Sequence, residues 1–525
     1  MTISDMLARN ARLYPEDTAL VELMPSRHIR REVTWREFDE RANRIANALL
    51  ERGVGRGDKV IHWMLNSIVW LEAYFGIIRT GAWAVPLNFR FTGEDMKYCT
   101  EIAEPKAVIL GEEFLGRLDE VRSTLPHIEH YVVSGQDVPG DMGSLEDLMA
   151  GASRYPTGVP LGNDEGCGLY FTSGTTGAPK PILLSHGNME WAAVTEQAHH
   201  GQTKDDNFIL LPPLYHTGAK MHWFGNLLVG AKGTILRDIN PWDIFSAVSS
   251  EGGTIVWLLV PWAHDILVAL DSGELRRENY DLSRWRLMHI GAQPVPPSLV
   301  RRWKRYFPHM QYDTNYGLSE AAGPGCVHLG VENEHKVGSI GRSGYGWEAQ
   351  IVGASGQAVR DGQVGELLVR GGGVMKGYFK NPEKTAETIR DGWLYTGDMA
   401  RTDEDGFIYL VDRKRDVIIT GGENIYPVEI EEVLHTHPHV YDAAVIGVPD
   451  TRLGEVAVAV IEMKPGASVT RTEMSAFCEE RLARHKRPRR IVFDRIPRNP
   501  TGKIEKPKLR RKYRSLPLIN HLAGQ

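Results

Sequence analysis

The residues from Thr172 to Lys180 have the side chains and the glycine spacing needed to hold a polyphosphate. Four hydroxyl groups and two glycines occupy six consecutive positions, and Lys180 adds a mobile positive charge. Glycine lets the backbone approach a ligand closely, so successive N–H groups can surround an anion. The candidate phosphate contacts are Thr172, Ser173, Gly174, Thr175, Thr176, Gly177 and Lys180. The stretch predicts a phosphate-binding loop, with a polar hairpin turn as the simpler alternative.

A kinase-type or GTPase-type P-loop does not fit this spacing. The Walker pattern needs four residues between its first glycine and a Gly-Lys-Ser/Thr sequence. Here Gly174 and Gly177 are three apart, and Pro181 follows Lys180.

The loop instead resembles the signature phosphate loop of the adenylate-forming superfamily, which includes acyl-CoA synthetases, amino-acid adenylation domains and beetle luciferases. Five further stretches resemble the family's other motifs. They follow in the family's order, and the six together extend from Thr172 to Lys503. The resemblance therefore covers nearly the whole chain, and it implies sites for ATP, Mg²⁺ and coenzyme A.

The second motif runs from Asn315 to Glu320 and reads Asn-Tyr-Gly-Leu-Ser-Glu. In the family its aromatic ring stacks on adenine, its hydroxyl meets the α-phosphate and its glutamate holds magnesium. The resemblance thus assigns nucleotide contacts to Asn315, Tyr316, Gly317 and Ser319. Mg²⁺ prefers hard oxygen ligands and shares them with substrate phosphates. We therefore expect Glu320 and Thr172 to be ligands of Mg²⁺.

Two motifs resemble the family's adenine and ribose contacts. Gly291, Ala292 and Gln293 match the turn that cradles adenine, although Gln293 replaces the small residue most often found there. Asp398 matches the aspartate that holds both ribose hydroxyls, as carboxylates do in dinucleotide sites. Arg413 matches the arginine that joins it at the ribose.

The last two motifs resemble segments that the family uses in different half-reactions, one to form the acyl-adenylate and the other to transfer the acyl group to CoA. Gly421, Gly422 and Glu423 resemble the loop that lines the pantetheine channel after the C-terminal domain turns. Lys503 resembles the adenylation lysine, which bridges the carboxylate and the α-phosphate. Arg415 falls at the hinge position, where the family commonly has Asp or Lys. His216 matches a position beside the reacting carboxylate, so the resemblance implies that Lys503, His216 and Glu320 are catalytic.

Composition is consistent with a globular protein. The 525 residues carry 61 basic and 67 acidic side chains, so the net charge of −6 argues against a general nucleic-acid surface. The four cysteines are widely separated and form no CxxC pair, which argues against a zinc ribbon or a disulfide framework. No signal peptide or membrane span is apparent, so we expect a cytoplasmic protein. Whether it forms a homodimer is left open.

Hydrophobic patterning predicts an α/β fold. Strand-like runs near 19–23, 59–64, 84–87 and 107–110 alternate with helical patterns, which predicts doubly wound parallel sheets. Thr34 and Glu37 form a capping box before the helix that Gly53 ends. Glycine-punctuated short strands after Gly338 predict a small β unit.

The expected domains are an N-terminal adenylate-forming domain (1–412), a hinge (413–416) and a small mobile α+β C-terminal domain (417–525). In the C-terminal domain, helices are expected at 427–434 and 471–484, with strands at 443–447 and 456–462. The basic run 484–490 could meet the 3′-phosphate of CoA, but a solvated face is the simpler interpretation.

Together these features predict an AMP-forming acyl-CoA synthetase, an acid–thiol ligase that consumes a carboxylic acid, ATP and CoA. An amino-acid or aryl-acid adenylation domain is the principal alternative. The former would ordinarily carry an acidic residue after the Pro212-Pro213-Leu214 strand end, and none is present. A luciferase-like oxygenase would emit light from its adenylate. A non-catalytic nucleotide-binding module would have lost Glu320 or Lys503, and both are present.

The residues after His216 bear on the acid. Lys220, Met221, His222 and Trp223 follow it in the region where the family builds part of its acyl pocket. A long-chain tunnel would use small and aliphatic residues there. We therefore expect a short, cyclic, aromatic or polar acid, with Trp223 capping the acyl channel if it points inward.

Overall fold

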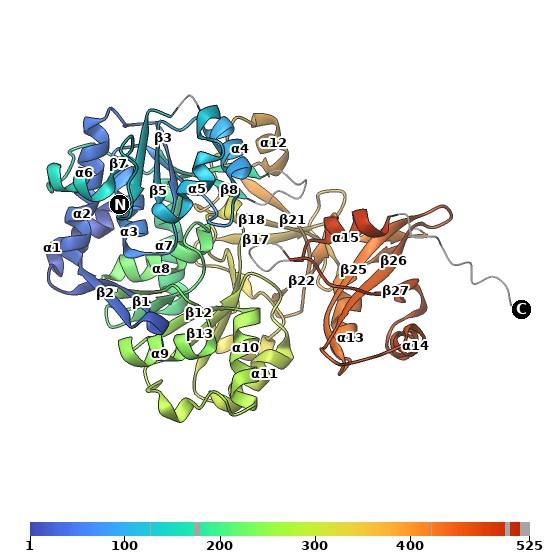
Figure 1. Ribbon diagram of the computed structural model, residues 1–525. Helices are drawn as coiled ribbons and strands as arrows, with labels where there is room; N and C mark the ends of the chain where they lie inside the picture. Colours follow the sequence, from blue (N-terminus) through green and yellow to red (C-terminus); the bar gives the residue numbers. More distant parts are fainter. Residues whose placement is uncertain (126–127, 173–178, 422, 499–503, 515–525) are drawn as a thin grey trace, which may run out of the picture. The chain divides into compact units, whose positions relative to one another are not determined.

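The computed structural model describes residues 1–125, 128–172, 179–421, 423–498 and 504–514 (Figure 1). The chain divides into two compact units. Unit 1 contains Met1–Ala349 and Leu368–Tyr395, and unit 2 contains Gln350–Leu367 and Thr396–Gln525. The expected boundary at 412 and the hinge at 413–416 stay predictions, because this division does not test which residues move.

The larger sheet of unit 1 has, within the described residues, nine strands in the order β16-β15-β14-β13-β12-β10-β11-β1-β2. Its strands are β1 (Thr18–Met24), β2 (Ile29–Thr34), β10 (Asn207–Leu210), β11 (Lys232–Leu236), β12 (Ile255–Leu259), β13 (Leu287–Gly291), β14 (Gln311–Tyr316), β15 (Val327–His328) and β16 (Arg342–Ser343). The central strands β11 to β14 are parallel, so their carboxyl ends share one edge of the sheet. Ligands bind at such edges in α/β proteins.

A second sheet of unit 1 has, in the same described ranges, eight strands in the order β19-β9-β8-β4-β3-β5-β6-β7. Its strands are β3 (Lys59–Trp63), β4 (Trp83–Pro86), β5 (Ala107–Gly111), β6 (His130–Ser134), β7 (Gly143–Ser144), β8 (Gly166–Thr172), β9 (Lys180–Ser185) and β19 (Gly377–Tyr378). Both sheets are buried on two faces, which explains the continuous apolar runs in their strands.

One large hydrophobic cluster lies between the two sheets and includes residues of both. The helices that contribute to it are α1 (Ile3–Leu13), α2 (Trp35–Glu51), α3 (Ile68–Arg79), α6 (Leu145–Gly151), α7 (His186–His200) and α8 (Thr217–Val229). Alternation within β3 shows how each strand serves two cores: Val60 belongs to this cluster and Ile61 to the cluster on the opposite face. The expected capping box of Thr34 and Glu37 is confirmed at the start of α2.

Other helices cover the outer faces of the sheets (Figure 1). They are α4 (Gly93–Ala103) and α5 (Leu115–Asp119), which share a hydrophobic cluster with β5, and α9 (Pro241–Glu251), which contacts β10 and β11. Helix α10 (Val260–Asp271) contacts β12, and α11 (Pro297–Tyr306) contacts α10. The remaining helix of unit 1, α12 (Pro382–Thr388), contacts β19. None of the helices in the described ranges has the length and apolar character that crossing a membrane requires.

The glycine-punctuated region forms a small sheet, as expected. Its strands are β17 (Glu348–Val352), β18 (Gly365–Arg370), β20 (Ile389–Arg390), β21 (Trp393–Thr402) and β22 (Ile408–Arg413). Their order is β17-β18-β21-β20, and β22 pairs with β21 in antiparallel register.

Unit 2 also holds an α+β sandwich. Its strands β23 (Ile418–Thr420), β24 (Glu423–Ile425), β25 (Val440–Asp450), β26 (Gly454–Met463) and β27 (Arg490–Phe493) form one sheet in the order β24-β23-β26-β25, with β27 on β26. Helices α13 (Pro427–His435) and α14 (Arg471–Arg481) pack on one face and α15 (Lys506–Tyr513) on the other. The helix expected to reach 484 ends three residues earlier, and a short 3₁₀ turn follows it at Arg484–Lys486.

Candidate functional site

The phosphate loop joins two antiparallel strands. Thr172 ends β8, Lys180 begins β9, and the two residues face each other across the hairpin. The Thr172 hydroxyl donates a hydrogen bond to the Lys180 carbonyl at 3.4 Å. Both side chains are half-buried. Ser173, Gly174, Thr175, Thr176 and Gly177 lie outside the described residues, so their phosphate contacts stay predictions.

The candidate adenine turn follows β13 directly. Gly291 is the last residue of that strand and is buried. Ala292 then takes φ +68°, a left-handed conformation that costs free energy for a residue with a Cβ atom. Such strain is concentrated at ligand-binding sites. Ala292 is exposed and Gln293 half-buried, so both can reach a ligand at the strand end.

The Asn315–Glu320 motif continues from the neighbouring strand β14. Gly317 is required by packing, because a Cβ atom there would lie 2.3 Å from the Gly323 carbonyl oxygen. Ser319 accepts a hydrogen bond from the Thr217 hydroxyl at 3.4 Å. Tyr316, at 8% exposure, is nearly buried. Since β13 and β14 are adjacent and parallel, the structure brings this motif and the candidate adenine turn to one sheet edge.

Glu320 has a partner that the sequence did not indicate. The Tyr378 hydroxyl donates to Glu320 Oε1 at 3.0 Å, and burial beside this carboxylate raises the Tyr378 pKa above its ordinary value. Tyr378 lies on β19, which pairs with β9 of the phosphate hairpin. The half-buried Glu320 carboxylate has one oxygen fixed, and Thr172 lies on the same sheet as Tyr378. The carboxylate and the threonine hydroxyl are hard oxygen donors that fit Mg²⁺.

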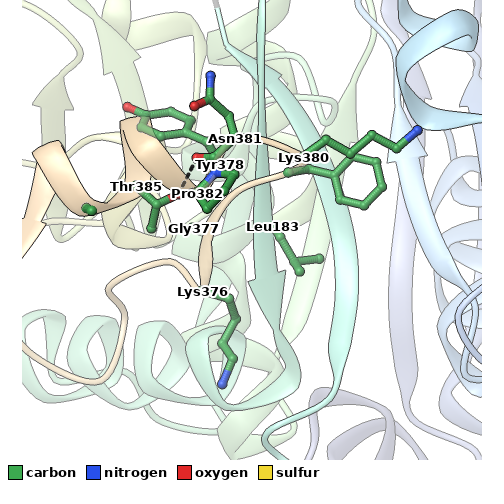
Figure 2. A pocket seen from close by; sticks show the side chains of 10 residues that line it. Leu183, Lys376, Gly377, Tyr378, Lys380, Asn381, Pro382 and Thr385 are labelled. Carbon is green, nitrogen blue, oxygen red and sulfur yellow. Dashed lines mark hydrogen bonds between the residues drawn. The ribbon is translucent and has the colours of Figure 1, made fainter.

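Tyr378 also lines a surface groove of about 440 Å³ next to this position. Figure 2 shows that β19 and the start of α12 form its wall, with Leu183 of β9 at one side. The Thr385 hydroxyl accepts a hydrogen bond from the Tyr378 backbone N–H at 2.9 Å. This bond fixes the β19–α12 turn that positions the Glu320 partner.

His216 lies at the amino end of α8, where it is the N-cap residue. Its imidazole contacts the Tyr215 ring at a centroid distance of 4.3 Å and is half-buried. Asn66 positions the preceding strand end, because its side chain bonds both Pro212 and Leu214. The expected proximity of His216 to a reacting carboxylate stays a prediction.

Helix α8 corrects the expectation for Trp223. This indole packs in the core, so close to β11 that a Cβ atom on Gly233 would lie 2.5 Å from its Nε1. Its neighbour His222 instead lies near the sheet edge that carries the candidate adenine turn, stacked on Trp257 with ring centroids 4.2 Å apart. Adjacent helical residues point about 100° apart, so His222 and Trp223 face different surroundings, and Trp223 packs in the core instead of pointing inward to an acyl channel.

The candidate ribose contacts lie in unit 2. Asp398 on β21 and Arg413 on β22 are cross-strand partners, and Arg413 Nε lies 2.9 Å from Asp398 Oδ1. The aspartate side chain is 9% exposed, whereas the arginine is 45% exposed. The pairing holds the carboxylate in one orientation, as a clamp for two hydroxyls requires.

Gly421 and Glu423, two further candidates in unit 2, are exposed. Gly421 takes φ +57° at a tight turn, and Glu423 begins β24. Arg415, in the expected hinge, has its pKa lowered by burial, opposed by Asp416 nearby. Gly422 and Lys503 lie outside the described residues.

The AMP-binding enzyme family matches residues 7–379, and the AMP-binding enzyme C-terminal domain matches residues 429–503. The chain belongs to the AMP-binding enzyme family. The first match covers well over half of the chain.

Proteins similar to this chain are CoA ligases. A feruloyl-CoA synthase from Amycolatopsis sp is 36% identical over 96% of this chain and 98% of its own length. The solved anthranilate CoA ligase AuaEII, in complex with anthranoyl-AMP, is 28% identical, with a TM-score of 0.88 and 98% of both chains covered. ATP-bound MatB from Rhodopseudomonas palustris is also 28% identical, with a TM-score of 0.88, covering 98% of this chain and 99% of its own. The protein is an AMP-forming acyl-CoA synthetase, an acid–thiol ligase that uses ATP and CoA.

Sequence reasoning missed several residues that the fold brings to the site. Tyr378 and Trp257 each contact a predicted residue but stand in no motif, and Thr217, next to His216, was assigned no role. A buried group of histidines and carboxylates behind β13 and β14 was also missed. Its members come from separate elements, so spacing along the chain carries no signal for them.

Proposed function

We propose that this synthetase activates an aromatic or similarly compact carboxylic acid. Its carboxylate attacks the α-phosphorus of ATP, which releases pyrophosphate and gives an acyl-adenylate. The CoA thiol then attacks the acyl carbon, and AMP leaves. The acid class is supported by the names of the similar proteins, which include feruloyl-CoA and anthranilate ligases.

The observation that carries the acid class is the stack of His222 and Trp257. Their planes are 24° apart, and Trp257 extends across to α8, where a Cβ atom on Gly218 would lie 3.1 Å from it. A Cβ atom on Gly291 would lie 3.7 Å from Trp257 Nε1. These rings occupy space beside the candidate adenine turn, so we expect a short and flat acyl site rather than a long channel. Flat rings also pack well against planar acids.

Each candidate residue has a proposed role. In unit 1, Tyr316 and the Gly291–Gln293 turn would hold adenine, and the phosphate hairpin would hold the triphosphate. Asp398 and Arg413 of unit 2 would bind the ribose hydroxyls. Lys503 would contact the carboxylate during adenylation, and Gly421, Gly422 and Glu423 would line the pantetheine channel.

Glu320 and Thr172 are the proposed Mg²⁺ ligands. The ion would neutralise charge on the phosphates. Tyr378 keeps Glu320 oriented through its 3.0 Å hydrogen bond. His216 would orient the attacking carboxylate by hydrogen bonding, so catalysis rests mainly on positioning.

The four cysteines, all within the described ranges, are buried and free of disulfides. This fits the proposed cytoplasmic location, because disulfides are rare in reducing compartments.

The test is a pyrophosphate-release screen over carboxylic acids, followed by mass spectrometry of the CoA products. We expect the highest kcat/KM with hydroxycinnamic, benzoic or related ring acids and little turnover with long straight-chain acids. A clear preference for long-chain acids would contradict the proposed substrate class while leaving the ligase assignment intact.

A further inference from the structure

A buried cluster of imidazoles and carboxylates lies in unit 1 behind the candidate adenine turn. We call it the histidine cluster, and its members come from five elements: Glu196 and His200 of α7, His222 of α8, His289 of β13, Asp313 of β14 and His328 of β15. All six residues are at most 3% exposed. Four of the six have no role in the proposed catalytic steps: His200, His289, Asp313 and His328.

Hydrogen bonding determines which nitrogen of His289 carries a proton. His222 Nδ1 donates to the Gly218 carbonyl, so its Nε2 is an acceptor. The Asn315 amide donates to this Nε2 at 2.9 Å, and His289 Nε2 lies 3.1 Å from it. His289 therefore donates through Nε2 and is left with a lone pair on Nδ1. That lone pair points to His200 Nε2 at 3.1 Å.

Several donor atoms converge at this point. Asp313 Oδ2 lies 3.2 Å from His200 Nε2 and 3.2 Å from His328 Nδ1. One donor atom from each of these three residues lies within 4.8 Å of the other two. His289 Nδ1 is 3.9 Å from the same carboxylate oxygen. Donors about 2.0–2.2 Å from a tetrahedral ion are roughly 3.3 Å apart, so these separations suit such an ion.

The outer atoms of His200, His328 and Asp313 have partners of their own. His200 Nδ1 lies 3.2 Å from Glu196 Oε2, and His328 Nε2 lies 3.5 Å from Glu196 Oε1. One carboxylate thus faces the outer nitrogen of both imidazoles. The other oxygen of Asp313, Oδ1, accepts the backbone N–H groups of Thr314 and Gly330 at 2.8 and 2.9 Å. Ligating histidines and carboxylates are commonly oriented by such outer partners.

Charge balance also favours a cation here. Glu196 and Asp313 are fully buried carboxylates, and burying such a charge without compensation costs several kcal/mol. The outer nitrogens of His200 and His328 face Glu196, so both imidazoles would turn their inner nitrogens toward an ion. A dication among them would compensate both carboxylates.

We propose that the histidine cluster binds one structural Zn²⁺ ion, with His200, Asp313, His328 and His289 as ligands and Glu196 as the outer carboxylate. Imidazole nitrogens with one carboxylate suit zinc, and four protein ligands make a closed site rather than a catalytic one. The ion would tie α7 to β13, β14 and β15. Two of these strands lead directly into Gly291 and Tyr316, so the site would hold the adenine-binding turns in place.

The test measures zinc in protein purified without a histidine tag and dialysed against metal-free buffer. We expect about one zinc per chain by mass spectrometry. His328→Gln and Asp313→Asn should lose this zinc, whereas His309→Gln, which changes an exposed histidine, should keep it. Glu196→Gln should weaken zinc binding by about 10- to 100-fold in a chelator competition assay.

A measurement on the wild type keeps the test decisive if a variant does not fold. Crystals of the wild type should show an anomalous peak at the zinc edge between His200, Asp313 and His328. A wild type that takes up no zinc when supplied with it would overturn the proposal and leave a metal-free network of imidazolium–carboxylate pairs. Equal zinc content in folded His328→Gln and wild type would also overturn it, because the metal would then lie elsewhere.

Discussion

Glu320 is the one carboxylate of the proposed magnesium site. Its position at the end of the Asn315–Glu320 motif could be predicted from sequence, but the residue that holds it could not. Tyr378 lies 58 positions further along the chain and reaches Glu320 because β19 pairs with β9. The predicted residue is thus oriented by one that stands in no motif.

We predict that Glu320→Gln lowers the rate of acid-dependent pyrophosphate release by about 10²-fold at low Mg²⁺. A neutral amide is a poor ligand for a hard dication. Raising the Mg²⁺ concentration should recover part of the rate. Glu332→Gln changes an exposed glutamate on a nearby turn and should leave the rate unchanged. Full activity of Glu320→Gln at limiting Mg²⁺ would contradict the assignment.

At the scale of elements, boundaries were more predictable than side-chain direction. The capping box at Thr34 and Glu37 and the left-handed Gly53 determine the two ends of α2 locally, so its limits could be predicted from sequence. Which residue of α8 faces the site depends on how the helix packs between two sheets. That is why Trp223, which was expected at the acyl site, packs in the core, whereas His222 and Trp257 lie beside the candidate adenine turn.

We predict that Trp257→Leu shifts substrate preference toward bulkier or longer acids. Removing the indole opens space beside Gly218 and Gly291. A hydrophobic site gains only about 1–3 kcal/mol per methylene, so the change should appear as a shift along a ladder of acids rather than a switch.

The matched control is Trp223→Leu, which removes an indole of the same size from the same region. It should lower thermal stability, because it leaves a cavity in the core, and keep the acid profile. If Trp223→Leu shifted the profile and Trp257→Leu did not, the acyl site would lie on the other side of α8.

The contact between α2 and α3 gives a prediction for pH. Glu72 is buried, and this burial raises its pKa from 4.5 to about 7 despite Arg41, whose Nε lies 2.7 Å from Oε1. The unfolded chain releases this proton near pH 4.5 and the native protein only near pH 7. The contribution of Glu72 to stability is therefore present below pH 4.5 and is lost as pH rises to about 7.

We expect Glu72→Gln to gain stability relative to the wild type as pH rises across that window. Urea unfolding of both proteins at pH 5 and pH 8 measures the difference, with the variant favoured more at pH 8. A difference in unfolding free energy that is equal at the two pH values would show that Glu72 is ionised throughout.

At the scale of the whole molecule, sequence predicted the class of fold and the family because six motifs occur in order along 525 residues. Such motifs are local. The histidine cluster is not, since Glu196 and His328 are separated by 132 positions and meet only through the sheet order. The division into two units is not local either, because β17 and β18 each have residues in both units.

We predict that Lys503→Ala loses adenylate formation by about 10²- to 10³-fold but still converts supplied acyl-adenylate to acyl-CoA. The expectation rests on the proposal that this lysine acts in only one of two domain orientations. The two half-reactions are measured separately, with Lys508→Ala, an exposed lysine in α15, as the control. Equal losses in both half-reactions would contradict a mechanism with two orientations.

The most direct test of the central claim follows oxygen from the acid. An aromatic acid labelled with ¹⁸O in its carboxylate is incubated with ATP, CoA and the enzyme, and the nucleotide product is analysed by mass spectrometry. If the carboxylate attacks the α-phosphorus and the thiol then attacks the acyl carbon, each AMP formed carries one ¹⁸O. Label in inorganic phosphate together with ADP, or unlabelled AMP, would contradict the acyl-adenylate mechanism.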